Sequence, residues 1–78
     1  MTLTQPACFP VHSSLLAGVG YDADESILQL QFCDGDIYQY FDVPAVIYEI
    51  LLAAESKGTC FNHHIRGHFR YALLSRPR

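Results

Sequence analysis

The stretch that decides the fold is ILQLQFCDGDIYQYF, residues 27–41. Apolar residues alternate with glutamines over residues 28–32, which is the pattern of a half-buried β-strand. Asp34-Gly35 is a hairpin signal, and residues 37–41 continue the alternation on its far side. The stretch therefore predicts two antiparallel strands joined by a tight turn.

The length of the hairpin loop follows from the two faces of the predicted sheet. A two-residue turn at Asp34-Gly35 would pair Gln31 with Tyr38 and mix glutamines with tyrosines on one face. A three-residue loop over residues 33–35, with Gly35 in the left-handed conformation, pairs Leu30 with Tyr38 instead. We favour the longer loop because it separates an apolar face from a polar one. The two faces are Leu28, Leu30, Phe32, Tyr38 and Tyr40 against Gln29, Gln31 and Gln39.

A third strand is predicted before this hairpin. Leu15, Ala17, Val19 and Tyr21 recur at period two, which indicates a strand that ends near Asp22. Residues 1–10 contain two prolines and little periodicity. The sequence thus predicts a flexible N-terminal arm over residues 1–12, one domain over residues 13–74, and a frayed tail over residues 75–78.

Helices are predicted after the hairpin. Pro44 suits a first helical position, with Asp42 ahead of it as a cap. An apolar stripe at helical spacing follows, and Gly58 is expected to end this helix in the left-handed conformation. The stripe consists of Val43, Val46, Ile47, Ile50, Leu51 and Ala54. A shorter helix is expected over residues 59–66, ending at Gly67.

The predicted fold class is α+β. Three antiparallel strands form a β-meander that packs against one main helix, with a short second helix after it. Alternation of Phe69, Tyr71 and Leu73 predicts that the chain returns as a short strand or an extended tail.

Length and composition exclude several classes of protein. A chain of 78 residues, half of them hydrophobic, fits one globular domain. No stretch reaches the roughly 20 apolar residues that span a bilayer. The first 56 residues contain no Lys or Arg, which argues against a secretory signal.

Three widely spaced cysteines do not suggest a disulfide framework. We expect a cytoplasmic protein with reduced thiols and no membrane partner.

Charge is divided sharply along the sequence. All eight acidic residues lie between Asp22 and Glu55, and all five Lys and Arg lie between Lys57 and Arg78. The basic third also contains Phe61, Phe69 and Tyr71, a composition that suits single-stranded nucleic acid. Alternatively, the two halves simply neutralise each other across the fold, with the phenylalanines in the core.

Metal and catalytic sites have weaker support. Cys60, His63 or His64, and His68 could share one helical face, but a structural zinc site needs a fourth ligand. The pairs Cys60 with His63 and Asp34 with Asp36 are the only hints of catalysis, and Asp is common in tight turns for its local hydrogen bonds. We therefore predict no metal, no cofactor and no enzymatic activity.

Short motifs follow one another in a fixed order over about Ser13 to Tyr71. They are Ser14 through Gly20-Tyr21-Asp22, Leu28-x-Leu30-x-Phe32, Asp34-Gly35, Tyr38-Gln39-Tyr40, Val43-Pro44, Ser56-x-Gly58, Phe61-Asn62 and Ile65-Arg66. This ordered series resembles the KTSC domain, a module named after the C-terminal region of some lysyl-tRNA synthetases. The resemblance implies a small bacterial protein without an established activity, for which RNA binding has been suggested. It also directs attention to Tyr38, Tyr40, Asn62 and Arg66.

The leading hypothesis is a non-enzymatic RNA-binding module. Lys57, Arg66 and Arg70 would contact phosphates, with Asn62 and Tyr71 beside them. The alternative is a protein-interaction module, in its simplest form a homodimer through an unpaired sheet edge.

Overall fold

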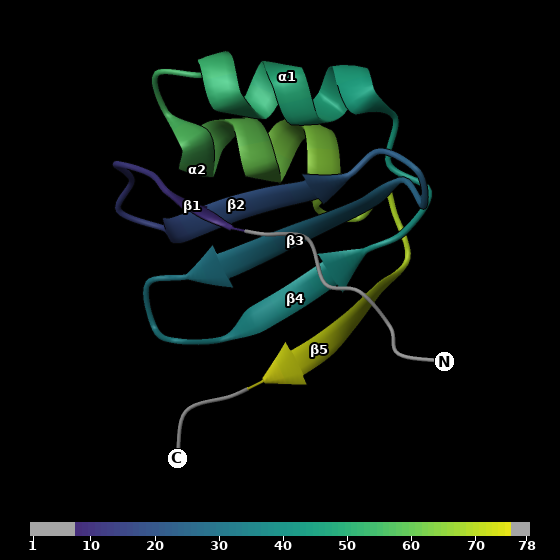
Figure 1. Cartoon of the computed structure of the whole chain (residues 1–78). Coiled ribbons are helices and arrows are strands. Elements are labelled where there is room, and N and C mark those ends of the chain that lie inside the picture. Colours follow the sequence, from purple (N-terminus) through teal and green to yellow (C-terminus); the bar gives the residue numbers. More distant parts are fainter. Residues whose placement is uncertain (1–7, 76–78) are drawn as a thin grey trace.

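Over residues 8–75, five antiparallel strands form one sheet in the order β1-β2-β3-β4-β5, and the helical segments lie on one side of it (Figure 1). The structure is a computed structural model and describes residues 8–75. Its elements are β1 (Phe9–Pro10), β2 (Leu16–Asp22), β3 (Ile27–Phe32), β4 (Ile37–Tyr40), α1 (Ala45–Ala53), α2 (Lys57–Cys60), η1 (Phe61–Ile65) and β5 (Tyr71–Ser75). No helix in this part of the chain is long and apolar enough to cross a membrane.

The β3–β4 hairpin has the predicted three-residue loop. Leu30 lies opposite Tyr38 in the ladder. The amide of Phe32 donates to the carbonyl of Asp36 across the loop (2.8 Å), and Gly35 adopts a φ of 99°. Glycine reaches this left-handed region without the steric cost that other residues bear. The prediction from face parity is therefore confirmed.

The sheet is larger than the predicted meander of three strands. Phe9–Pro10 pairs with β2, so the end of the predicted flexible arm is an edge strand, while residues 1–7 lie outside the described part. At the other edge, β5 pairs with β4 and confirms the short C-terminal strand. It includes Ser75, which was predicted to begin the frayed tail; residues 76–78 are outside the described part.

A β-bulge changes which side of β2 faces the core. The register with β3 shifts between Leu16 and Gly18, so strict alternation is broken there. Leu16 and Val19 are fully buried, whereas Ala17, which was predicted to share the inner face with Val19, is exposed. Period-two counting fails here because the bulge adds a residue that sequence parity does not reveal.

Both predicted ends of the main helix are wrong. Pro44 precedes α1 as its cap residue, and no side chain caps this end; Asp42 instead adopts a φ of 57° outside the helix. Gly58 lies within α2 rather than in a left-handed terminus. The end of α1 is stabilised by Lys57, whose Nζ donates to the carbonyls of Leu52 (3.2 Å) and Ala54 (3.0 Å). Cations favour this negative end of a helix.

The packing face of α1 is rotated from the predicted stripe. Leu51 is buried and Ile47 is half-buried, but Val46 is 55% exposed and Ile50 is 38% exposed. Tyr48, which the stripe omitted, stacks on Tyr21 with ring centroids 4.9 Å apart. The outer side of α1 is thus apolar as well. The apolar pattern in the sequence therefore did not identify which side of the helix packs on the sheet.

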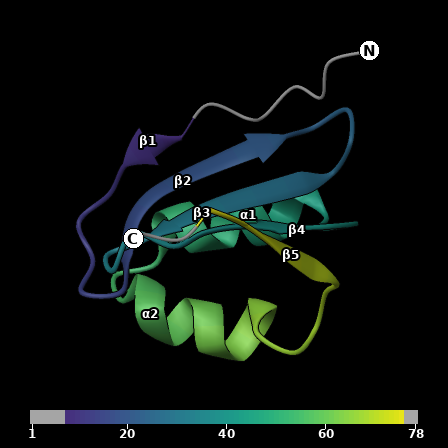
Figure 2. The same ribbon diagram turned by 90° about the horizontal axis from the view of Figure 1, so that it is seen from below.

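The core lies between the sheet and the helical segments. Figure 2 shows the α2–η1 segment beside the strands, with β5 returning from its end to the sheet edge. Phe61 and Ile65 project from η1 into this layer. The buried apolar residues are Leu16, Val19, Leu28, Leu30, Tyr40, Val43, Leu51, Cys60, Phe61 and Ile65.

The opposite face of the sheet carries the glutamines, as predicted, but its centre is not open to water. Gln29 is only 4% exposed. Its Oε1 accepts from Gln39 Nε2 at 3.0 Å, and its own Nε2 lies 3.6 Å from the sulfur of Cys8. Burial of an amide is tolerated when its polar atoms have partners.

Candidate functional site

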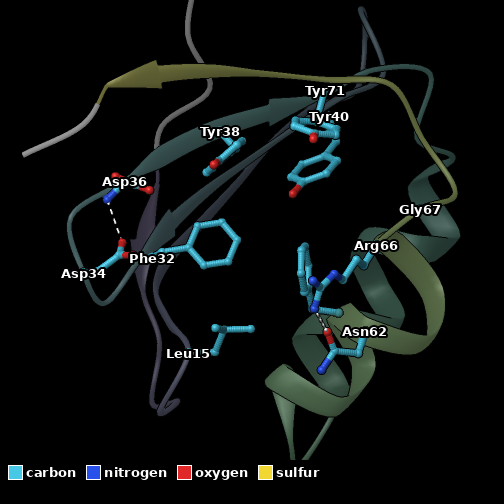
Figure 3. Close-up of a pocket in the computed structure, with 11 residues that line it drawn as sticks. Leu15, Phe32, Asp34, Asp36, Tyr38, Tyr40, Asn62, Arg66, Gly67 and Tyr71 are labelled. Carbon is cyan, nitrogen blue, oxygen red and sulfur yellow. Dashed lines mark hydrogen bonds between the residues drawn. The ribbon is translucent and has the colours of Figure 1, made fainter.

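A groove of about 610 Å³ lies between the sheet and η1 (Figure 3). Its position follows from the fold, since the β3–β4 hairpin, η1 and the beginning of β5 converge there. The lining residues are Leu15, Phe32, Asp34, Asp36, Tyr38, Tyr40, Phe61, Asn62, Arg66, Gly67 and Tyr71.

Aromatic rings form most of the apolar lining. Phe32 meets Tyr38 and Phe61 edge-on, at centroid separations of 5.5 Å and 5.4 Å. The Tyr71 ring lies 5.6 Å from that of Tyr38 and 5.5 Å from that of Tyr40. Such spacings are typical of stabilising aromatic pairs, so the rings hold one another in place.

Tyr40 is the buried member of this cluster. Burial raises the pKa of its phenol to about 12, with further increases from Tyr38 and Tyr71 and an opposing decrease from Arg66. The Tyr40 hydroxyl is therefore neutral at physiological pH and available as a hydrogen-bond donor or acceptor. Tyr71, in contrast, is 62% exposed and presents its ring to solvent.

The side of the groove formed by η1 carries a cation and an amide. Arg66 Nη1 donates to Asn62 Oδ1 at 3.5 Å, and both side chains are exposed. The backbone winding places them: Arg66 N donates to the carbonyl of Phe61 at 2.9 Å, which closes a π-turn. Gly67 then ends the helix at a φ of 79°, as the sequence predicted.

The opposite side of the groove is acidic. Asp34 and Asp36 both come from the β3–β4 loop and lie at the end of the groove away from Arg66 (Figure 3). The amide of Asp36 donates to Asp34 Oδ1 at 2.9 Å, which is the turn-stabilising role expected for Asp. The groove therefore combines an acidic end, an aromatic middle and a basic end.

Five of the seven predicted site residues meet in this groove: Tyr38, Tyr40, Asn62, Arg66 and Tyr71. The other two are engaged elsewhere. Lys57 binds the carbonyls at the end of α1. Arg70 pairs with Asp42 at 2.9 Å and lies over the ring of Phe41, outside the groove.

Sequence reasoning did not assign Phe32, Asp34 or Asp36 to the site. A signal for them was present, because the three-residue loop already put Phe32 on the same face as Tyr38 and placed both acids beside that face. The acids were interpreted as turn residues alone. In the structure Asp34 has both roles, since it stabilises the turn and lines the groove.

Cys60, His63 and His64 line a second hollow, beside the end of α1. Burial raises the pKa of the Cys60 thiol, although the charge of Lys57 opposes this shift. Because the pKa is raised, less of the thiol is present as the reactive thiolate. His63, His64 and His68 are exposed. Among residues 8–75, no group of three His, Cys, Asp or Glu side chains could hold a metal ion.

Comparison with known proteins gives short relatives of similar length. A protein from Tsukamurella paurometabola is 43% identical over 65 residues, which cover 83% of this chain and 97% of the relative. An uncharacterized protein from Stutzerimonas stutzeri is 39% identical over 62 residues, covering 78% of this chain and 87% of the relative.

The same sequence also matches part of a much longer enzyme. A lysine–tRNA ligase from a Nostoc species is 40% identical over 62 residues, covering 80% of this chain but only 11% of the ligase. The ligase thus contains a segment similar to this domain, in addition to the rest of its chain.

The solved structures and the family profile agree with these matches. The crystal structure of a KTSC domain protein from Yersinia pestis superposes with a TM-score of 0.88 at 34% identity, covering 91% of this chain and all of the other. The profile of the KTSC domain matches residues 12–69, most of the chain. The protein therefore belongs to the KTSC domain family.

Proposed function

We propose that this KTSC domain binds single-stranded RNA in the groove between the sheet and η1. The observation that carries the proposal is the meeting of Tyr38, Tyr71 and Arg66 in one open groove. Exposed aromatic rings stack on unpaired bases, and an arginine beside them can contact the backbone phosphate. The function is one of binding, without a chemical step.

Tyr71 is the best placed stacking residue. The residue is 62% exposed, and its ring packs against those of Tyr38 and Tyr40. Stacking of one base on an aromatic side chain contributes about 1–3 kcal/mol to binding. Tyr40 is buried and serves the site by supporting the other rings and by offering its neutral hydroxyl.

Arg66 is the best placed phosphate ligand among the described cations. Within residues 8–75 its side chain makes one hydrogen bond, to the neutral amide of Asn62, so its charge is not already paired with a carboxylate of this region. Arg70 lies four residues away but faces Asp42. A planar guanidinium with free donors suits bidentate contact with phosphate.

The comparisons add support from a different direction. A similar domain occurs as about one tenth of lysine–tRNA ligases, enzymes that take a tRNA as substrate by name. An RNA-binding role for the module is compatible with such a fusion. This support comes only from the occurrence of a similar domain in these ligases, whereas the physical argument comes from the residues of the groove.

The two arginines provide the first test. Fluorescence anisotropy of a labelled single-stranded RNA should show binding that weakens as salt is raised. We expect Arg66→Ala to reduce affinity about tenfold, which corresponds to losing one charge-assisted contact. Arg70→Ala is the matched control, with the same change in charge, and should change affinity less than about twofold. Equal effects of the two variants would contradict a groove-specific site.

Two exposed aromatic residues provide the second test. Tyr71 and Phe9 have almost the same exposure, 62% and 61%, but Phe9 is on β1, at the other edge of the sheet. Tyr71→Ala should weaken RNA binding about tenfold, whereas Phe9→Ala should leave it unchanged. Absence of RNA binding by the unmodified protein, even at low salt, would overturn the proposed function.

A second candidate function is self-association through β5. In the described part of the chain β5 pairs on one side only, and Leu73 and Leu74 are each 39% exposed. Exposed apolar edge strands tend to pair with another strand. Size-exclusion chromatography over a concentration series tests this: a shift to a dimer that Leu74→Lys abolishes would support it, and a monomer at every concentration would reject it.

A further inference from the structure

We infer that the acidic end of the groove selects guanine among the bases of a bound strand. The inference rests on the proposed RNA-binding function and extends it to sequence preference. It begins from the position of Asp34 in the groove lining, opposite the Arg66 side. A carboxylate repels phosphate, so attraction of phosphates alone does not account for an acid in the groove lining.

The chemistry of the bases identifies the ligand. A carboxylate only accepts hydrogen bonds, so it matches a base edge that only donates. Guanine presents two adjacent donors, N1–H and the exocyclic N2–H2, to such a pair of oxygens. Uracil offers one ring N–H between two carbonyl oxygens, and adenine and cytosine place an acceptor next to their amino group. The donor pattern therefore favours guanine.

Asp34 has the capacity for this contact. Its Oδ1 accepts one hydrogen bond from the amide of Asp36, whereas an ionised carboxylate has about four acceptor positions. The rings of Phe32 and Tyr38 stand next to the loop that carries it. A base held against these rings would direct its edge to Asp34, since stacking and edge recognition use perpendicular directions.

The charge distribution also sets the direction of the bound nucleotide. The carboxylate of Asp34 repels phosphate from one end of the groove, and Arg66 attracts it to the other. The base is thus placed toward the loop and its phosphate toward η1. A volume of about 610 Å³ leaves room for a nucleotide in this orientation.

The test compares labelled RNA oligomers that differ at one central position, occupied by guanosine, inosine, adenosine or uridine within an oligouridine context. Inosine retains N1–H but lacks the N2 amino group. We expect guanosine to bind about tenfold tighter than uridine or adenosine, with inosine between them. Inosine loses only the N2 contact to Asp34, whereas uracil and adenine each place an acceptor atom against its carboxylate. Anisotropy at one fixed salt concentration is the measurement.

Asp34→Asn is the diagnostic variant because Asn retains the acceptor that stabilises the turn. It should reduce the guanosine-to-inosine affinity ratio to about one. Asp24→Asn is the matched control, since Asp24 is an exposed acid on the other turn, between β2 and β3. This control should keep the ratio of the unmodified protein. Thermal unfolding of both variants checks that the fold is retained.

The outcomes separate the two proposals. If the four oligomers bind with equal affinity, the guanine inference fails and the RNA-binding function stands. Unchanged discrimination in Asp34→Asn would also reject the inference. If no oligomer binds but a short arginine-containing peptide does, the groove recognises a protein segment, and both proposals are overturned.

Discussion

The two faces of the sheet are both buried at their centres, but by different means. On the face toward the helical segments, Leu28 and Leu30 are fully buried among apolar side chains. On the other face, Gln29 is almost as buried, yet its amide is satisfied by Gln39 and Cys8. The first face is stabilised by removing apolar area from water, the second by satisfying polar atoms that have left it.

The difference teaches where the stability of so small a domain comes from. Burial of a leucine contributes directly, whereas a buried hydrogen-bonded amide contributes little net free energy but is costly to leave unpaired. Leu30 and Gln29 are neighbours on β3 and point to opposite faces. They form a natural pair for measuring the two contributions in the same strand.

The largest effect is expected for Leu30→Ala. Removal of this side chain leaves a cavity at the centre of the core, and such changes cost about 2–5 kcal/mol in free energy of unfolding. Urea denaturation monitored by circular dichroism is the measurement. A cost below about 1 kcal/mol would mean that the helix-covered face is not the main source of stability.

A smaller effect is expected for Gln29→Ala, about 1–2 kcal/mol, because the Gln39 amide loses its partner in a mostly buried position. The same urea experiment measures it. Gln31→Ala, a change to a half-buried glutamine on the same face, is the control and should cost about 0.5 kcal/mol or less. If Gln29→Ala proved as costly as Leu30→Ala, the contrast between the faces would be lost.

The third effect appears only at alkaline pH and concerns Tyr40 on the helix-covered face. Its pKa is about 12 in the folded protein, against 10.0 for an ordinary tyrosine. The folded state therefore keeps a proton that the unfolded state has released between pH 10 and 12. The contribution of Tyr40 is complete below pH 10 and is lost as pH rises toward 12.

Two measurements check this alkaline behaviour. The free energy of unfolding should fall between pH 10 and 12, and less so in Tyr40→Phe. Spectroscopic titration of the phenols should contain a component near pH 12 that the same variant removes. Titration of all tyrosines together near pH 10 would contradict the burial of Tyr40.

Local patterns made the hairpin predictable, whereas features that depend on long-range contacts were not predictable. The register of Leu30 with Tyr38 follows from parity within 15 residues. The bulge at Leu16 and the short strand β1 depend on partners in space, so no local period reports them. The packing side of α1 was also not predictable, because its exposed side is apolar too and only contacts with the rest of the fold distinguish the two sides.

The candidate site was predictable to about the same degree. Five of the residues that the sequence predicts share the groove: Tyr38, Tyr40, Asn62, Arg66 and Tyr71. Lys57 and Arg70 were grouped with Arg66 by charge alone, but a helix end and Asp42 engage them. Charge composition cannot distinguish a cation that stabilises the fold from one that is available to a ligand.

The π-turn of η1 takes up one residue more than an ordinary helical turn without redirecting the chain beyond it. The hydrogen bond from Arg66 to Phe61 encloses this extra residue. Deleting one of the adjacent residues His63 and His64 would let the segment wind as a regular α-helix. Arg66 would then lie four residues after Phe61, about one helical turn away, and would keep nearly its present direction. A chain one residue shorter in this segment would therefore still present Arg66 to the groove, from an ordinary helix.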